Sequence, residues 1–344
     1  MSRKVAMIVF AILSLHLSFI FFRAHAVLES DQVQDNRKKI IIDTDAGGDD
    51  AVALMLALAT KEVQILAITC TYGNTIIENV EINVLKTLTI ANRSDIPVFS
   101  GAQKPLLNNY TATGYFGEDG FGDFHFDKKL SSHIDKSNHA VNAMISLVGK
   151  YPGEVNILVL GPLTNVALAA SLDSNFTKLV KKFYVMGSSI KESSENPGYT
   201  EIEFNFNNDP EGNAIFLNST TQSLSLVLPW DIAAKSNISK KWRTEILGKL
   251  ESESIKFLNK VESVTLNKLN EWQPSDSIAV AAMIWPDLVI SSLKTRMTAV
   301  IRGPLRGSVM LKHPTNNISN NVEIVTNFNN EAFQAKLIAH LAQL

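Results

Sequence analysis

Residues 38–59 read KKIIIDTDAGGDDAVALMLALA and decide the fold of this 344-residue chain. The segment from Lys38 to Asp43 is short, rich in isoleucine and continuously apolar after its two lysines, which is typical of a strand buried on both faces of a parallel sheet. The segment from Asp49 to Ala59 predicts a helix with two acids in its first turn, where the helix dipole favours negative charge. A buried strand followed closely by a helix is the first half of a βαβ unit.

The same alternation of strands and helices continues along the chain. We expect further strands at 63–72, 97–101, 155–160, 182–187 and 224–229, helices at 80–92, 138–150, 164–171, 276–284 and from 331 onward, and a mostly helical stretch over 239–272. Three β-rich runs follow at 294–301, 307–312 and 321–327, and two long polar loops lie at 102–136 and 188–202. We therefore predict a single α/β domain over 38–344, with a mostly parallel, doubly wound central sheet and additional β-rich segments near the C-terminus.

Composition excludes several classes of protein. Hydrophobic residues make up 45% and charged residues 19% of the chain, which is typical of a globular core and excludes a disordered or collagenous chain. The formal net charge is −2, so the chain has no basic field that would attract nucleic acid. The single cysteine, Cys70, excludes an intrachain disulfide framework, and its apolar neighbours predict a buried thiol.

The amino terminus predicts a secretory signal peptide. Arg3 and Lys4 precede an apolar run from Val5 to Phe22, and Ala24-His25-Ala26 forms a small-x-small cleavage pattern. We expect cleavage after Ala26, a flexible leader over 27–37, secretion, and no stable membrane association of the mature chain. The apolar run is long for a signal peptide, so an uncleaved anchor is the alternative. Six glycosylation sequons give mild support to a secreted glycoprotein; they lie at Asn92, Asn109, Asn175, Asn218, Asn237 and Asn317.

The segment DTDAGGDD, residues 43–50, places four carboxylates within eight residues. It leaves a buried strand and opens a helix, so its acids are expected in the crevice where parallel sheets bind ligands. Their mutual repulsion requires a cation, and hard oxygen ligands favour Ca²⁺ or Mg²⁺ over zinc. The alternative is a solvated helix start, which accounts for Asp49 and Asp50 but not for Asp43 and Asp45.

The spacing Asp43-x-Asp45-x-Gly47-x-Asp49-Asp50 resembles the signature of the nucleoside hydrolases of the inosine–uridine-preferring type. The resemblance extends along the mature chain, from about Lys38 to the C-terminus. Further matching blocks occur in the same order: TYGN at 71–74, GEDGFG at 117–122, LGPLTN at 160–165, MG at 186–187, EFNF at 203–206 with DPE at 209–211, and DSIAV at 276–280. Several blocks in order are far more specific than any one of them alone.

This resemblance implies a Ca²⁺-dependent hydrolase that cleaves the N-glycosidic bond of ribonucleosides to ribose and free base. It implies a set of calcium ligands, Asp45, Asp50, Asp276 and the backbone carbonyl of Leu160, with Asp45 also the general base for the attacking water. It assigns the following residues to the ribose: Asp49, Asn74, Asn196, Glu203 and Asn205. Asn196 departs from the family spacing by about one residue. Related proteins often form dimers or tetramers, so a homo-oligomer stays open.

The departing base needs a proton or a stacking surface. Phe116 and Ser275 stand where some family members have histidines, so the resemblance gives no histidine acid here. Purine-preferring members stack the base between aromatic rings, and Phe116 fits one face of such a site. Trp272 and Tyr199 are candidates for the other face, although helix packing is the favoured interpretation of Trp272. We therefore expect a purine preference.

Two local sequence patterns predict the structure around further candidate residues. Ser275 is expected to cap a helix that begins at Asp276. Glu203 and Asn205 alternate with two phenylalanines as in a strand, which places the polar pair on one face.

One alternative function is a secreted calcium- or nucleoside-binding homologue with impaired catalysis. A less favoured one is a haloacid-dehalogenase-like phosphatase, which also begins with Asp-x-Asp but needs a downstream lysine and a second acidic motif that we do not find.

Overall fold

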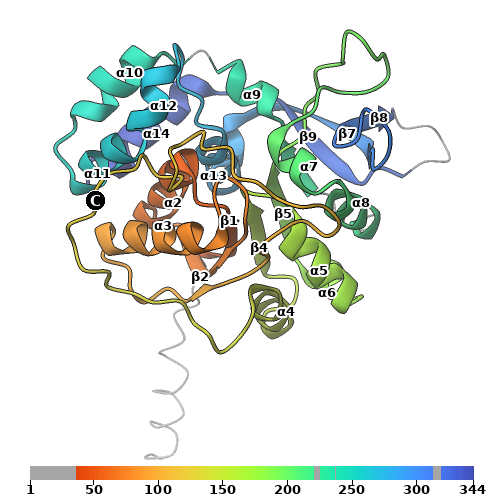
Figure 1. The fold of residues 1–344 in the computed structure, drawn as a ribbon, viewed down its shortest axis with the longest axis horizontal. Helices are drawn as coiled ribbons and strands as arrows, with labels where there is room; N and C mark the ends of the chain where they lie inside the picture. Colours follow the sequence, from red (N-terminus) through yellow and green to blue (C-terminus); the bar gives the residue numbers. More distant parts are fainter. Residues whose placement is uncertain (1–35, 221–224, 237, 313–318) are drawn as a thin grey trace, which may run out of the picture. The chain divides into compact units, whose positions relative to one another are not determined.

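The computed structural model of the chain describes residues 36–220, 225–236, 238–312 and 319–344 (Figure 1). Residues Lys38–Leu344 form one compact unit. The signal peptide predicted over 1–26 lies outside the described residues, as do most of the leader and the sequons at Asn237 and Asn317. No described helix combines the length and the apolar character that a membrane span requires.

Within the described residues, nine strands form one sheet in the order β3-β2-β1-β4-β5-β6-β9-β7-β8. In chain order they are β1 (Lys38–Thr44), β2 (Val63–Cys70), β3 (Val98–Phe99), β4 (Val155–Val159), β5 (Lys182–Met186), β6 (Ser225–Leu228), β7 (Val289–Ala299), β8 (Val309–Lys312) and β9 (Val322–Phe328). The first six strands and β9 pair in parallel, whereas β7 is antiparallel to both β9 and β8. The predicted α/β class, mostly parallel sheet and β-rich C-terminal segments are confirmed.

Helices pack against both faces of this sheet, as the predicted doubly wound arrangement requires. One apolar core joins α2 (Gly48–Ala59), α3 (Ile77–Ile90), α11 (Glu253–Val261), α13 (Ser275–Ile284) and α14 (Asn330–Leu341), and a second joins α4 (Ala140–Lys150), α5 (Thr164–Leu172), α6 (Phe176–Leu179) and α8 (Pro210–Ser219). Ile40 and Ile42 of β1 enter the first core and Ile41 enters the second. Because both faces are covered, β1 is apolar at successive positions.

One expectation about local structure is wrong. The stretch from Glu203 to Phe206 is not a strand: α7 (Phe204–Asn208) begins there, and the Glu203 carboxylate accepts hydrogen bonds from the N–H groups of Asn205 (2.9 Å) and Phe206 (3.0 Å). The stretch 239–272 is mostly helical as predicted, divided into α10 (Lys240–Glu245), a 3₁₀ turn, α11 and α12 (Ser263–Lys268). Helices this short carry too few turns for a periodic pattern to reveal the breaks between them.

The order of the strands reverses between β1 and β4. The chain adds β2 and β3 on one side of β1, and β4, β5 and β6 on the other. Open parallel sheets bind ligands at such a point, outside the carboxyl ends of the strands. Asp45, just beyond β1, and Leu160, just beyond β4, therefore occupy the expected ligand crevice. Cys70, at the end of β2, is fully buried as predicted.

Candidate active site

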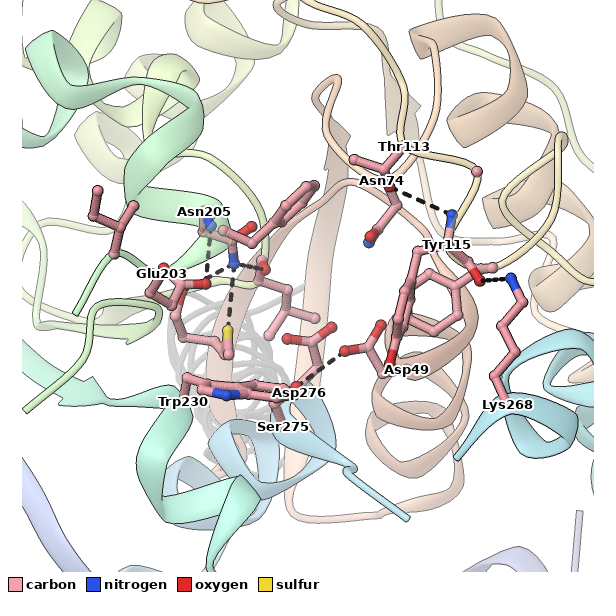
Figure 2. A pocket seen from close by; sticks show the side chains of 16 residues that line it. Asp49, Asn74, Thr113, Tyr115, Glu203, Asn205, Trp230, Lys268, Ser275 and Asp276 are labelled. Atoms are coloured by element: carbon pink, nitrogen blue, oxygen red, sulfur yellow. Dashed lines mark hydrogen bonds between the residues drawn. The ribbon is translucent and has the colours of Figure 1, made fainter. Parts of the chain in front are cut away.

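A cavity of about 550 Å³ lies at the carboxyl ends of the strands (Figure 2). In that view Asp49 and Asp276 lie between Trp230 on one side and Tyr115 on the other. The side chains and carbonyls around it are, by chemistry, polar (Asp49, Asn74, Thr113, Glu203, Asn205, Lys268, Ser275 and Asp276) and apolar or aromatic (Tyr115, Phe116, Leu160, Met186, Ile202, Phe204 and Trp230). The cavity thus combines an acidic centre with apolar walls, a combination suited to a ligand that has one polar and one apolar part.

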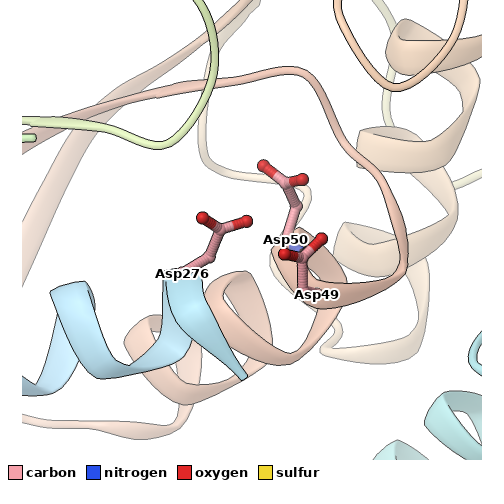
Figure 3. Close-up of side chains that lie close together, drawn as sticks. All are labelled: Asp49, Asp50 and Asp276. Atoms are coloured by element: carbon pink, nitrogen blue, oxygen red, sulfur yellow. Dashed lines mark hydrogen bonds between the residues drawn. The ribbon is translucent and has the colours of Figure 1, made fainter. Parts of the chain in front are cut away.

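Three carboxylates from distant parts of the chain meet at this centre (Figure 3). Asp49 and Asp50 open α2, Asp276 lies in the first turn of α13, and these two helices pack together. Oxygen atoms of the three side chains all lie within 4.8 Å of one another. Burial, followed by the charge of Asp50, raises the pKa of Asp49 to about 7. Burial, followed by the charges of Asp49, Asp50 and Asp45, raises the pKa of Asp276 well above its usual range.

Asp45 lies beside this trio, buried between two glycine-containing segments. A Cβ atom added at Gly73 would stand 2.0 Å from the Asp45 carboxylate, and one at Gly161 would stand 3.0 Å from the same side chain. Only glycine permits so close an approach of backbone to side chain. The backbone N–H of Asn74 donates to Asp45 Oδ2 (2.8 Å). Burial, followed by the charges of Asp50 and Asp49, raises the pKa of Asp45.

The carboxylate of Asp50 is held in one orientation by three donors. The hydroxyl of Thr44 donates to its Oδ1 (2.5 Å), and the N–H of Gly47 (2.9 Å) and the side-chain amide of Asn74 (3.2 Å) donate to its Oδ2. Burial raises the pKa of Asp50 despite these contacts. Asn74 lines the cavity and also orients the carboxylates of Asp45 and Asp50. Its expected role was confined to the ribose.

The donor set fits a hard divalent cation. None of the ion pairs found among the described residues involves Asp45, Asp49, Asp50 or Asp276. In the described part of the chain, Lys268 is the single cationic side chain that lines the cavity, and its ammonium donates to the carbonyl of Tyr115 (3.2 Å) instead of a carboxylate. Uncompensated buried carboxylates with oxygen-only donors are the chemistry that selects Ca²⁺ or Mg²⁺.

Glu203 and Asn205 line the cavity from the start of α7. The Glu203 carboxylate also accepts the N–H of Ser188 (2.8 Å), and burial raises its pKa to about 7. The side-chain amide of Asn205 donates to the carbonyls of Leu160 (2.7 Å) and Met186 (3.2 Å). These bonds attach α7 to the ends of β4 and β5 and fix the direction of the Leu160 carbonyl, an expected calcium ligand.

Asn196, unlike Asp45 and Asp50, neither lines the cavity nor has a described hydrogen bond to a residue that does. It belongs to the loop between β5 and α7, where its N–H donates to the carbonyl of Ser193 (3.3 Å), and it is not among the lining residues. Ser275 does line the cavity, but its expected capping role is wrong. Pro274 occupies the N-cap position of α13, and the Ser275 hydroxyl donates to Asp49 (3.0 Å).

The aromatic walls differ in part from those expected. Phe116 packs on the acidic loop, because a Cβ atom at Gly47 or Gly48 would come within 2.9 or 2.7 Å of its ring. Tyr115 meets Phe116 edge to face, with ring centroids 4.8 Å apart. The opposite wall includes Trp230, the first residue of α9 (Trp230–Ala234). Sequence reasoning missed Trp230, although its position directly after an expected strand placed it at the ligand edge of the sheet.

The two rings proposed from the sequence for the second face lie outside the cavity lining. Trp272 is buried among helices, where its indole N–H donates to Glu262 (2.5 Å) and its ring lies 6.0 Å from that of Trp242. The favoured packing interpretation of Trp272 is therefore confirmed, and its role as a base-stacking ring is wrong. Tyr199 belongs to the same loop as Asn196.

Comparison with known proteins finds similarity to nucleoside hydrolases and nucleosidases. The family model of the inosine-uridine preferring nucleoside hydrolase matches residues 40–335. Uridine nucleosidase 1 of Arabidopsis thaliana is 36% identical over 187 residues, which are 54% of this chain and 54% of that protein. The inosine-uridine preferring nucleoside hydrolase of Crithidia fasciculata is 35% identical over 187 residues, 54% of this chain and 58% of that protein. The chain thus spans little more than half the length of these curated relatives.

Solved structures match over a larger share of the chain. An inosine-guanosine nucleoside hydrolase superposes with a TM-score of 0.81 and 27% identity, covering 89% of this chain and 98% of that one. A plant nucleoside hydrolase superposes with a TM-score of 0.78 and 27% identity, covering 89% of this chain and 99% of that one.

Proposed function

The chain belongs to the inosine-uridine preferring nucleoside hydrolase family, and from this premise we propose that it is a calcium-dependent enzyme that hydrolyses the N-glycosidic bond of ribonucleosides to ribose and free base. The observation that carries the proposal is the meeting of Asp276, from the first turn of α13, with Asp49 and Asp50, from the start of α2, at the edge of the cavity. A ribonucleoside matches the cavity because its diol is polar and its base is largely apolar.

Calcium would be held by Asp45, Asp50, Asp276 and the carbonyl of Leu160, and when bound it would orient the vicinal ribose hydroxyls and lower the pKa of water. Asp45 then accepts the proton of the attacking water. Asp49, steadied by the Ser275 hydroxyl, accepts a hydrogen bond from a ribose hydroxyl. The acidic surroundings favour the positive charge that develops on the sugar in an oxocarbenium-like transition state.

A purine is the favoured base. Phe116 and Tyr115 form one wall of the cavity and Trp230 lies on the other, so a bicyclic base has aromatic surface available to it. The names of the relatives point both ways, since they include uridine nucleosidases and an inosine-guanosine hydrolase. Stacking also favours protonation of the departing ring, which matters because no histidine is among the lining residues that the structure describes.

A substrate panel tests the proposal. The purified mature chain is incubated with inosine, adenosine, guanosine and uridine, in calcium and in chelator, and release of free base and ribose is measured. We expect calcium-dependent release that is faster for the purine nucleosides. The variant D45A should lose turnover and keep its circular dichroism spectrum. Release from uridine alone would contradict the purine preference but leave the activity standing.

One second candidate has an observation in its favour. Because no described lining residue is a histidine, the chain could bind calcium and a nucleoside without turnover. Nucleoside binding by calorimetry, with no base released from any member of the panel, would identify such a binding protein. The phosphatase alternative gains no support, because Lys268 is engaged with a backbone carbonyl and contacts no described carboxylate of the acidic centre.

We further propose that residues 1–26 direct secretion, with cleavage after Ala26, and that the mature chain is glycosylated. The four sequon asparagines in the described residues, Asn92, Asn109, Asn175 and Asn218, are all exposed, which supports their modification. Protein recovered from the culture medium of expressing cells should begin at Val27 by N-terminal sequencing, and its mass should fall on treatment with an N-glycosidase. Retention of the whole product in the membrane fraction would support the uncleaved anchor.

A further inference from the structure

The acidic loop contains a strained residue. Ala46, between Asp45 and Gly47, has a φ of 25°, in the left-handed region that non-glycine residues avoid. Such a conformation is energetically unfavourable and persists only where the surroundings enforce it. Ala46 is fully buried, and two hydrogen bonds hold it: its N–H donates to the Thr44 hydroxyl (3.1 Å), and its carbonyl accepts from the side-chain amide of Asn83 (3.1 Å).

Asn83 joins this loop to a second segment of the site. It is buried on α3, and the same amide nitrogen donates to the carbonyl of Asp119 (2.8 Å). Asp119 belongs to the glycine-rich turn 117–122, which directly follows Phe116 of the cavity wall. Asn83 is not among the lining residues, and none of its described hydrogen bonds reaches a carboxylate of the acidic centre.

We propose that Asn83 is a positioning residue that sets the cation affinity of the site by holding Ala46 in its left-handed conformation. The Ala46 carbonyl fixes the peptide that leads into Gly47, and the Gly47 N–H is one of the three donors that orient Asp50. On the other side Ala46 is joined to Asp45. Release of the carbonyl therefore lets both acids leave the arrangement that binds a cation. This inference rests on the cation site of the proposed function.

The same helix offers two matched controls. One turn before Asn83, the amide of Asn79 donates to the Thr75 hydroxyl (3.0 Å) and to the carbonyl of Glu118 (3.5 Å). One turn after it, the ammonium of Lys86 pairs with the Asp119 carboxylate (3.3 Å). Both side chains hold the turn 117–122, but neither has a described hydrogen bond to the loop 43–50. N79A therefore loosens the turn without touching Asn83, whereas K86M also removes the bond from the Lys86 ammonium to Asn83 Oδ1 (3.5 Å) and leaves the bond from Asn83 to the Ala46 carbonyl in place.

The test is calcium binding measured by calorimetry on purified, chelator-stripped full chain, with urea unfolding to confirm that each variant is folded. We expect N83A to raise the calcium Kd about tenfold. The variant loses the hydrogen bond to the Ala46 carbonyl, so the strained conformation of Ala46 is no longer enforced. N79A and K86M should stay within about twofold of the wild type. The milder N83S, whose hydroxyl is too short to reach both carbonyls, gives the same comparison should N83A fail to fold.

A second experiment distinguishes the positioning of Ala46 by Asn83 from a general destabilisation of the fold. Glycine adopts positive φ without strain, so in an A46G background the loop needs the Asn83 bond less. The effect of N83A on the calcium Kd should shrink there to less than about threefold. Three results would overturn the inference: calcium binding unchanged in N83A and N83S, binding weakened equally by N79A, or an effect of N83A as large in the A46G background as in the wild type. A wild-type chain that binds no calcium would instead overturn the cation site itself.

Discussion

Replacing Asp276 with asparagine should stabilise the calcium-free protein, although it removes an expected ligand. The oxygens of Asp276, Asp49 and Asp50 lie within 4.8 Å of one another. Two unit charges at that separation repel by about 3.5 kcal/mol at an effective dielectric constant of 20. Two effects reduce the gain: the acids avoid part of the repulsion by taking up protons, and the charge lost from the first turn of α13 was worth about 0.3–1 kcal/mol. We expect a net gain of about 1–3 kcal/mol at about pH 8.

The pH dependence of this gain has a definite sign. The pKa of Asp276 is raised in the folded state, so the folded chain binds a proton that the unfolded chain releases. The contribution of Asp276 to the stability of the folded chain is then fully present below its unfolded pKa, near 4, and is lost as the pH rises through its folded pKa. The difference between D276N and the wild type should therefore be largest at alkaline pH and vanish near pH 4.

Calcium should reduce the stability advantage of D276N over the wild type by about 1.3 kcal/mol. At a calcium concentration of about 100 times its Kd the wild type gains about 2.7 kcal/mol, whereas a variant with tenfold weaker binding gains about 1.4 kcal/mol. Urea unfolding followed by circular dichroism, in chelator and in calcium, measures both effects. The control D287N removes an exposed acid that also opens a helical turn, and it should change stability by less than about 0.5 kcal/mol in either condition. If D276N is less stable than the wild type by the same margin with and without calcium, the argument from charge repulsion is refuted.

Three further predictions concern single side chains. D45A should lower kcat by a factor of about 10²–10⁴, as measured by ribose release at saturating calcium and nucleoside, and a loss confined to KM would contradict its role as general base. W230A should raise KM for inosine about tenfold with a smaller change in kcat, because the ring supplies contact area, not chemistry; an unchanged KM would remove Trp230 from the base site. Burial raises the pKa of Glu203 to about 7, so its contribution to stability falls as the pH rises towards and through 7. By urea unfolding, the wild type should lose about 2.5 kcal/mol more than E203Q between about pH 5 and pH 8. Equal losses would show that Glu203 does not titrate in this range.

Local physical signals were sufficient for the parts of the fold that precede and form the acidic loop. β1 was expected over 38–43 and ends at Thr44, and α2 was expected from Asp49 and begins at Gly48. Both elements are decided by their own residues, since the strand is apolar on two faces and the acids prefer a helix start. The alternation of further elements then gave the mostly parallel sheet, and hence the edge at which Asp45 and Leu160 lie.

Signals from a single segment were insufficient wherever a tertiary contact decides the structure. The carboxylate of Glu203 caps α7 while it also accepts the N–H of Ser188, two residues beyond β5, a bond between residues 15 positions apart. Ser275 donates to Asp49, 226 positions away, and so does not cap its own helix. By itself Asp276 reads as an ordinary helix start; its place beside the first acidic loop was expected only from the order of the family's blocks, which records contacts that composition and periodicity do not.

The unfavourable features of this site are concentrated in one small region. Asp45, Asp50 and Asp276 are buried without a basic partner among the described residues, and Ala46 in their midst is strained. Each feature destabilises the calcium-free chain, and each involves the loop or side chains that a cation would contact. A bound cation would therefore relieve the repulsion and favour the strained loop at once, so that part of the folding stability of this chain would depend on the ion. Variants that lose an acid should for that reason separate stability from activity, the pattern expected where a site is arranged for binding at the expense of the empty fold.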